Sequence, residues 1–463
     1  MAEAGRKEVF ETMPPARAIL TLAVPTIIAQ LVTVFYTVAD LFYVGQLGDP
    51  AQVAAVRLAF PPFLALTALA NLFGIGAASA IGRALGVKDE EKARACSAFA
   101  LWSGAAIAIL YSSLITLFQS ELFPLMGVVE QTRRPTALYL FWVVTAGSLP
   151  LIVSNILAHL VRAEGHARVA GNAIMLGGVF NVLIAPAFIF WMGLEIEGAG
   201  LAVFLSNVVS ALYIARYAFA RRDTTVVRVS PRFAALGVRH AAEIVTVGFA
   251  SFVMTGMACV VNMIFNTLSV GYGVQAMAGL GLAKQIDQLI FTCAIGLGQG
   301  VLPLIAYNYS SGNIGRLKAI ARTAAFGGVA AAAAASLLMI AFAPWITAAF
   351  IDEPVTNTYA AGGVRLIALA CPMAVIGHLT LCGFQACAQR WQPLLLAIMR
   401  KGVFDIPFML VFARLFGVYG IAAAMPAAEF FSMSFGLMLA LPFLRKLSHG
   451  TPAGAARPEG NRK

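Results

Sequence analysis

The sequence predicts an all-α polytopic membrane protein with twelve transmembrane helices in two pseudo-symmetric six-helix bundles. Hydrophobic residues make up 60% of the 463 residues and charged residues 11%, against roughly 25% charged in an average soluble domain. Apolar runs of about 20 residues, the length that crosses a bilayer, recur along the chain. These runs are continuous, whereas the strands of a membrane β-barrel alternate apolar and polar residues, so the spans are helices. A water-soluble globule is excluded.

The first predicted span follows a charged segment, residues 1–17, that contains Pro14 and Pro15. The apolar run after this segment is too long for a signal peptide and lacks a small-residue cleavage site, so we expect it to stay attached. The twelve predicted spans are 18–43, 52–80, 95–118, 136–161, 169–192, 198–220, 241–268, 275–304, 319–343, 361–388, 393–416 and 420–444. Proline lies in or beside most of them, which is compatible with helices that kink and move.

Charge predicts which side of the membrane holds the termini. An even number of spans places both termini on one side. Of the 32 Lys and Arg residues, Arg57 and Lys284 fall inside spans, and four (Arg133, Arg134, Arg365 and Arg414) lie in loops opposite the termini. The other 26, with Arg400 and Lys401 among them, are assigned to the terminal side. Because cytoplasmic loops are enriched in Lys and Arg, both termini are predicted to be cytoplasmic.

Weak internal repetition divides the chain into halves. Gly48 matches Gly271 at a shift of 223, and Arg94 matches Lys318 at a shift of 224. Two copies of six helices insert with the same topology, so their pseudo-two-fold axis runs along the membrane normal and substrate is expected between them. The predicted parts are a cytoplasmic tail (1–17), an N-terminal bundle (18–220), a cytoplasmic linker (221–240), a C-terminal bundle (241–445) and a second tail (446–463).

Ionisable residues inside spans are costly and therefore indicate function. Glu243, Arg57 and His159 lie close enough to span ends to be structural. Lys284 and Asp287, spaced i,i+3, share a helix face, where they either neutralise one another or take part in coupling. Asp405 and Glu429, whose repeat partners are Asn181 and Asn207, are weaker candidates for a cation site.

Asp40 is the strongest candidate for coupling transport to a proton. It lies in the first span with no basic residue three or four positions away. A carboxyl group in that position is expected to be partly protonated, as a proton-coupled carrier requires. Asn155 and Asn181 are the polar groups of the same half expected to join it. The alternative is a structural Asp bonded to backbone amides near Gly45 and Gly48.

Signals for other functional classes are weak. The six cysteines all lie in apolar segments without zinc-type spacing, the five histidines are scattered, and HExxH and GxSxG motifs are absent. We therefore expect no enzyme, no cofactor and no metal site. The formal charge of +11 fits basic cytoplasmic loops rather than nucleic-acid binding. The expected partners are the lipid bilayer and a small-molecule substrate, and the protein is expected to be a monomer.

Three segments carry a resemblance to a known family: Tyr36 to Gly48 (YTVADLFYVGQLG), Arg162 to Gly165 (RAEG) and Gly298 to Tyr309 (GQGVLPLIAYNY). They resemble the multidrug and toxic compound extrusion (MATE) family. Phe384-Gln385, and Arg400-Lys-Gly402 with Ile406-Pro407, resemble its bacterial multidrug-export branch. The resemblance covers residues 15–445. It implies a V-shaped pair of six-helix bundles in a prokaryotic plasma membrane, and alternating-access antiport of cationic amphipathic drugs against H⁺ or Na⁺.

The resemblance also assigns roles to particular residues. Asp40 matches the aspartate that takes the proton in the N-terminal bundle, and Asn155 and Asn181 match its polar partners. Ala185, before Pro186, replaces the Asp that many relatives carry, so the two-carboxylate form of the site is incomplete. Acids used for Na⁺ in another branch are also missing, since Ala258 lies near one such position and the region around Met373 lacks an acid. The second departure weakens a sodium mechanism of that type, and it leaves Asp405, Glu429 and Asp287 as unorthodox cation sites.

Three hypotheses follow for function. The leading one is an exporter of drugs or other organic cations, coupled through Asp40, Asn155, Asn181 and Asp287, with substrate bound by Phe35, Tyr36, Met254, Met257 and Lys284. The alternative is a flippase for lipid-linked saccharides, which needs a cavity rich in Arg and Lys, whereas Lys284 is essentially the only such residue expected inside a span. A membrane-embedded enzyme would need a convergent polar cluster that the sequence does not indicate.

Overall fold

The computed structural model describes residues 7–350 and 353–449, and these residues form helices without a β-strand. The N-terminal half contains η1 (Glu8–Thr12), α2 (Pro15–Gly45), α3 (Pro50–Leu58), α4 (Phe60–Gly86), α5 (Glu90–Leu117), α6 (Gln119–Leu125), α7 (Glu130–Leu140), η2 (Phe141–Ala146), α8 (Ser148–Ala163), α9 (Ala167–Pro186), η3 (Ala187–Trp191) and α10 (Glu195–Ala220). The connection holds α11 (Pro231–Gly237) and η4 (Val238–His240). The C-terminal half contains α12 (Ala241–Val270), α13 (Val274–Ser310), α14 (Ile314–Ala348), α15 (Pro354–Ala368), α16 (Cys371–Ala386), α17 (Gln392–Ile398), η5 (Met399–Phe404), α18 (Asp405–Phe416) and α19 (Val418–His449).

Local sequence signals set the helix boundaries. Proline occupies the first turn of α2, α3, α4 and α15, where its missing N–H would be unpaired in any case. Asp49 and Asp89 cap α3 and α5 by accepting hydrogen bonds from the backbone amides of Ala51 and Lys92. Gly165, at a φ of +93°, turns the chain sharply between α8 and α9.

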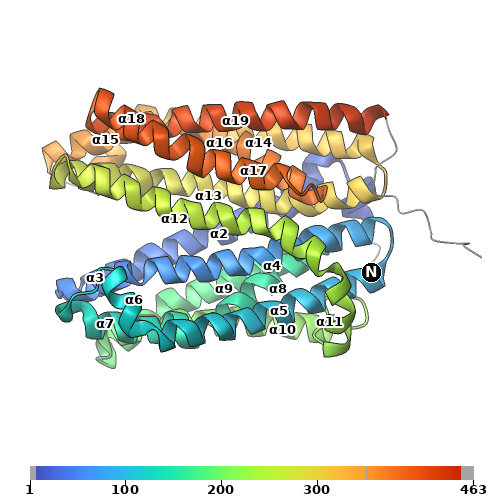
Figure 1. The fold of residues 1–463 in the computed structure, drawn as a ribbon, viewed down its shortest axis with the longest axis horizontal. Helices are drawn as coiled ribbons and strands as arrows, with labels where there is room; N and C mark the ends of the chain where they lie inside the picture. The colour runs from blue at the N-terminus through green and yellow to red at the C-terminus, as the bar shows by residue number, and fades with distance from the viewer. Residues whose placement is uncertain (1–6, 351–352, 450–463) are drawn as a thin grey trace, which may run out of the picture.

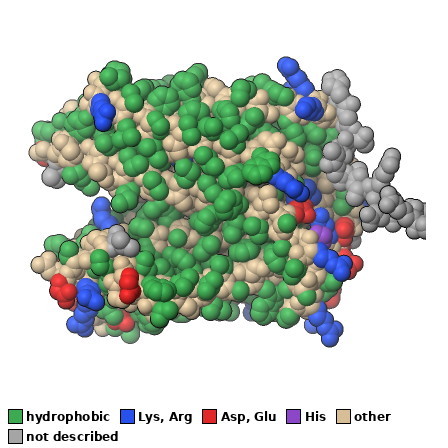
Figure 2. All heavy atoms as spheres, viewed as in Figure 1, with side chains coloured by type: hydrophobic (Ala, Val, Ile, Leu, Met, Phe, Trp, Pro, Cys, Tyr) green, Lys and Arg blue, Asp and Glu red, His purple; other side chains and the backbone are tan. Residues whose placement is uncertain are grey.

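The spans agree with the hydropathy pattern. Within the described residues, nine helices are long and apolar enough to cross a membrane, and two bent pairs raise the number to eleven. The predicted span 393–416 corresponds to α17, η5 and α18, a run that η5, a π-helix, interrupts. On the face seen in Figure 2, hydrophobic side chains form a broad middle band and charged side chains gather at the two ends, the distribution expected of spans in a bilayer.

The helices gather into two bundles, as the sequence predicts. In Figure 1, α3 to α10 lie below and α12 to α19 lie above, with α2 between them. The described start of the chain, α11 and the end of α19 all lie at one end of the molecule, here named the terminal end. At the opposite end, a notch separates the two bundles (Figure 2). The bundles thus meet at the terminal end and diverge at the other, here named the open end.

Glycines allow close backbone approach where the bundles meet. A Cβ on Gly248 of α12 would lie 1.7 Å from the carbonyl oxygen of Leu72, and one on Gly76 of α4 would lie 2.1 Å from that of Ile244. The α2–α13 crossing is similar, because a Cβ on Gly300 would lie 2.6 Å from Cα of Ala23. Small residues of this kind are the usual means by which membrane helices pack tightly. We name this contact between α2 and α4 on one side and α12 and α13 on the other the seam.

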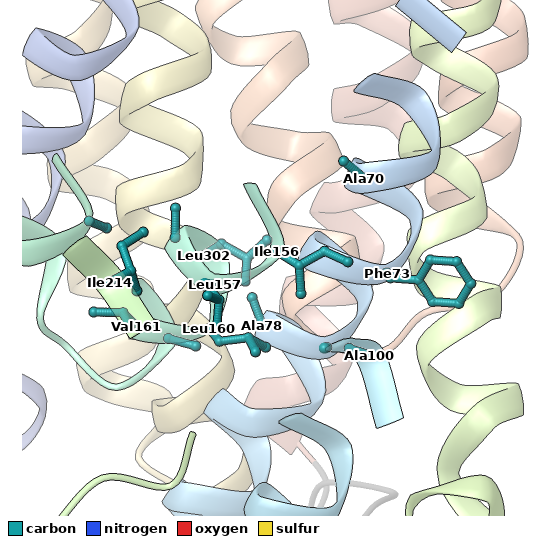
Figure 3. Packing of buried hydrophobic residues seen from close by; sticks show 14 of the residues in the cluster. Ala70, Phe73, Ala78, Ala100, Ile156, Leu157, Leu160, Val161, Ile214 and Leu302 are labelled. Atoms are coloured by element: carbon teal, nitrogen blue, oxygen red, sulfur yellow. The ribbon is translucent and has the colours of Figure 1, made fainter. Parts of the chain in front are cut away.

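The largest hydrophobic core continues across the seam. Ile156, Leu157 and Leu160 of α8 pack among residues of α4, α5 and α10, and the same cluster includes Leu302 of α13, from the other bundle (Figure 3). Packing of buried hydrophobic side chains therefore connects the two bundles near the terminal end.

Part of the predicted N-terminal tail is packed against this end. Phe10 of η1 is fully buried and stacks on Tyr307 with ring centroids 4.9 Å apart. Its carbonyl accepts hydrogen bonds from Arg316 Nε (2.8 Å) and Asn308 Nδ2 (3.2 Å), and its ring would meet a Cβ on Gly165. Residues 8–17 are thus helical or packed, while residues 1–6 and most of the C-terminal tail, 450–463, lie outside the described residues.

Candidate functional site

Asp40 lies in the N-terminal bundle, near the open end of α2. Its side chain is 5% exposed, and its Oδ1 has no hydrogen-bond partner among the described residues. The side chain that interacts with this carboxyl group is the amide of Asn181 in α9. The two groups are close but not aligned for a good hydrogen bond, and neither polar atom of the Asn181 amide has a hydrogen-bond partner among the described residues. Tyr36 and Tyr139 also lie within range of the Asp40 charge. The structure therefore places Asn181 beside Asp40.

Glycine spacing on α9 explains this proximity. A Cβ on Gly178 would lie 2.7 Å from Val32 and 3.1 Å from Tyr36, so only glycine lets α2 pack this closely one turn before Asn181. Nearby, the hydroxyl of Tyr43 donates to the carbonyl of Val182 at 3.4 Å. A buried carboxyl and a buried amide without good hydrogen bonds are costly, so the site favours taking up a proton or another polar group.

Other predicted residues of this region lie elsewhere. Asn155 is half-buried and donates to the carbonyl of Leu151 in its own helix at 2.9 Å, and no interaction described here joins it to Asp40. Phe35 is exposed. Met254 packs on the cluster of Leu381, Phe384 and Leu396, and a Cβ on Gly402 would meet Met257. None of Phe35, Tyr36, Met254 and Met257 lines the enclosed cavity described next.

The C-terminal bundle contains a cavity of about 90 Å³ where its helices are interrupted. One wall is the 46° bend between α15 and α16, represented by Ala370 and Cys371, and another is the π-helical η5 with α18. Such breaks free space inside a bundle and are frequent at functional sites. The charged residues that line the cavity are Lys284, Asp287, Lys401, Asp405 and Glu429.

Two ion pairs, one buried and one partly buried, occupy one side of this cavity. Arg400, 3% exposed, contacts Oε1 of Glu429 through Nη2 at 2.8 Å and Nε at 2.9 Å. Lys401 contacts Asp405 at 2.7 Å and lies 3.9 Å from Glu429. The assignment of Arg400 and Lys401 to the terminal side is therefore wrong, which reduces the 26 basic residues there by two, to 24. The hydropathy pattern missed this because Glu429, the partner that makes burial of Arg400 tolerable, lies 29 residues away.

Lys284 and Asp287 do not pair with each other, although the i,i+3 spacing allows it. Nζ of Lys284 lies 4.0 Å from the ring centroid of Phe265 in a cation–π contact. Asp287 instead accepts a hydrogen bond from the thiol of Cys371 at 3.3 Å. No ion pair within 4.0 Å joins either group to an oppositely charged side chain of the described residues. The direct ion pair, one of the two alternatives that the spacing allows, is thus not formed in this structure.

Comparison with known proteins places this chain. The MatE family model matches residues 25–187 and again 247–411, which together exceed half of the chain. The chain belongs to the MatE family.

Relatives and solved structures agree with this assignment. Multidrug export protein MepA of Staphylococcus aureus (strain MRSA252) is 27% identical over 420 residues, covering 91% of this chain and 92% of the relative. MepA of Staphylococcus saprophyticus is 28% identical over 421 residues, with the same coverage. A crystal structure of MATE in complex with MaL6 has a TM-score of 0.90 at 24% identity, covering 96% and 99% of the two chains. The predicted family and two-bundle fold are confirmed.

Polar residues of this MatE chain also close the seam. Arg83 of α4 contacts Glu243 of α12 at 2.6 Å, and Lys92 contacts the other carboxylate oxygen of Glu243 at 2.9 Å. Arg162 of α8 donates to Oε1 of Gln299 in α13 at 2.8 Å. The sequence assigned Glu243 a structural place at a span end but could not identify its partners, because they belong to the other bundle.

Proposed function

We propose that this MatE protein is a secondary antiporter that exports drugs or other organic cations across a bacterial plasma membrane. The proposed driving force is inward flow of protons, and the proposed route is alternating access between the two bundles. The buried carboxyl group of Asp40, whose Oδ1 has no hydrogen-bond partner among the described residues and which lies beside Asn181, is the observation that carries the proposal. The names of the MepA relatives, multidrug export proteins, support the substrate class.

Asp40 is suited to coupling because its helix touches both bundles. At its terminal end, α2 packs through Ala23 and Ile27 on Gly300 and Gly296 of α13, and towards the open end it packs on α9 around Asn181. A charged Asp40 carboxylate in an apolar environment is stable only beside a polar partner or water, whereas the protonated carboxyl group does not need one. A proton on Asp40 therefore changes the preferred packing of α2, and α2 carries this preference to the seam.

Proton coupling is favoured over sodium coupling. By resemblance, Ala185 replaces the Asp that many relatives carry before Pro186, and Ala258 lies near a position where another branch carries an acid used for Na⁺. One carboxyl group is enough to bind a proton, whereas Na⁺ prefers several oxygen ligands. Transport in proteoliposomes, with pH and Na⁺ gradients imposed separately, tests this choice directly.

A flippase remains the second candidate because the C-terminal bundle is more basic inside than the sequence predicts. Arg400, Lys401 and Lys284 all lie at or beside its cavity. Three acids, Asp287, Asp405 and Glu429, offset them, so the cavity has no surplus of positive charge for a pyrophosphate. This balance favours the exporter.

We place both termini in the cytoplasm, which makes the closed seam the inner gate and the observed state outward-open. Asp223 in the linker and Glu130 at the open end test this placement, because their side chains are 91% and 90% exposed. In intact cells, Glu130→Cys should react with a membrane-impermeant thiol reagent and Asp223→Cys should react only after permeabilisation. The wild type is a suitable blank, since its six cysteines are buried or half-buried. The reverse labelling pattern would invert the topology.

Loosening the seam should shift the conformational equilibrium. Gly248→Ala places a methyl group where the backbone of Leu72 lies, so α4 and α12 cannot close fully and the outward-open state is disfavoured. In the Gly248→Ala background, Glu130→Cys should keep the labelling pattern described above. A membrane-impermeant thiol reagent added from the cytoplasmic side should react with Ile244→Cys faster in this background than in the wild-type background. Gly256→Ala on the same helix is the matched control, because its Cβ would meet nothing within 4 Å. Equal effects of the two variants would contradict this role of the seam.

A further inference from the structure

The charges around the C-terminal cavity are unequally satisfied. Arg400 pairs with Glu429 and Lys401 pairs with Asp405, which leaves Lys284 and Asp287 without an ionic partner within 4.0 Å. Cys371 is a weak donor, so its hydrogen bond does little to offset the charge of Asp287. One unpaired cation and one unpaired anion thus line the same cavity.

The ammonium group of Lys284 is placed as a bound organic cation would be. It lies 4.0 Å from the centroid of the Phe265 ring, within the range in which aromatic faces attract ammonium groups. Lys284 reaches this ring from the adjacent helix, α13, and the ring belongs to α12. An aromatic face and a nearby carboxylate are together the usual elements of an ammonium-binding site.

We infer that this cavity is a binding site for an ammonium-type cation, and that the Lys284 side chain is its built-in occupant. The inference deepens the proposed export function, on which it rests, by naming a second site and the residues that form it. Phe265 supplies the aromatic face and Asp287 the negative charge. An incoming cation binds by displacing the Lys284 ammonium from the Phe265 ring.

Charge balance gives the reason for displacement. The charged groups that line the cavity with Lys284 are Asp287 from its own helix, Lys401 from η5, Asp405 from α18 and Glu429 from α19, and Arg400 of η5 pairs with Glu429 beside them. With Lys284 charged, three positive groups balance three negative ones. A further cation would leave a buried net charge, which is costly in a bilayer, unless Lys284 withdraws or gives up its proton. Entry of a cation is therefore an exchange.

The volume of the cavity limits the ligand. About 90 Å³ is open beside Lys284, and one water molecule needs roughly 10–15 Å³ of such space. A small ammonium head group fits, and a fused-ring drug does not. The site therefore takes primary alkylammonium or small quaternary ammonium ions, or the head group of a longer amine.

Truncating the internal cation should open the site. Lys284→Ala removes the side chain above Phe265 and should raise the affinity of the intact purified protein for tetramethylammonium by about tenfold or more, measured by titration calorimetry. n-Propylammonium, which replaces the missing side chain, should also raise the melting temperature of Lys284→Ala and leave that of the wild type unchanged. Lys88→Ala, at an exposed turn outside the cavity, is the matched control and should gain nothing.

A second substitution in Lys284→Ala tests which residues bind the added cation. Adding Asp287→Asn or Phe265→Leu to Lys284→Ala should abolish the new binding, and Lys284→Arg, which keeps the internal cation, should bind no better than the wild type. The inference is overturned if Lys284→Ala binds tetramethylammonium no better than the wild type, or if the gain survives both second variants. Because this binding needs no proton gradient, it should persist in an Asp40→Asn background. The binding measurement therefore tests this site independently of the transport measurement that tests the export proposal.

Discussion

Asp40→Asn is expected to abolish export driven by a pH gradient while leaving the protein folded and able to bind drug. The amide has the same volume as the protonated acid, and it can pair with the unsatisfied Asn181 without burying a charge. Coupling, however, requires a group that alternates between charged and neutral forms, which an amide cannot do. Efflux of a fluorescent cation from proteoliposomes measures the loss, and equilibrium binding of the same cation measures what is retained.

The control for this variant is Asp223→Asn, which makes the same chemical change on a linker side chain that is 91% exposed and should export normally. Asn181→Leu provides a second comparison. It removes the amide that interacts with Asp40 without removing the carboxyl, so export should weaken rather than disappear. Wild-type export by Asp40→Asn would place the coupling group elsewhere, and Asp287 would be tested next.

Sequence alone predicted the fold because hydropathy decides it. Each apolar run of sufficient length must satisfy its backbone internally, so the predicted spans correspond to helices or to helices bent at Gly147 and Ala370. Asp40 and Asn181 were also predictable, since Asp40 is the only Asp, Glu, Lys or Arg in its span and Asn181 is an amide in the interior of another apolar span. The interactions of Arg83 with Glu243 and of Arg162 with Gln299 were not, because each joins two bundles whose relative placement a local pattern does not contain.

The C-terminal cluster shows how the two halves diverged. At the repeat shift of 224, Asp405 matches Asn181 and Arg400 matches Leu176, and at a shift of 222 Glu429 matches Asn207. In the first half, Asn207 satisfies itself by donating to the carbonyl of Val203. The second half therefore carries acids where the first has amides, together with a basic partner for each acid. Of the two ion pairs, only Lys401–Asp405 could be predicted from sequence spacing, because its residues are separated by four positions.

These ion pairs lead to the largest expected effect on stability. Arg400→Met should lower the free energy of unfolding by about 3–5 kcal/mol, because it leaves the carboxylate of Glu429 buried with Lys401, 3.9 Å away, as its remaining cation. Glu429→Gln should also destabilise, since it leaves the buried guanidinium of Arg400 without its acid. Reversible unfolding in mixed detergent micelles measures both changes.

Replacing both partners should recover most of the loss. In Arg400→Met with Glu429→Leu, no charge of that pair remains to be compensated, and an apolar pair of similar size is often as stable as a buried ion pair. A double-mutant cycle then isolates the coupling between the two side chains. Arg322→Met, an exposed arginine on α14, is the control and should change the unfolding free energy by less than about 0.5 kcal/mol. If Arg400→Met unfolds like Arg322→Met, water reaches Glu429, and the cavity is an open site rather than a closed cluster of ion pairs.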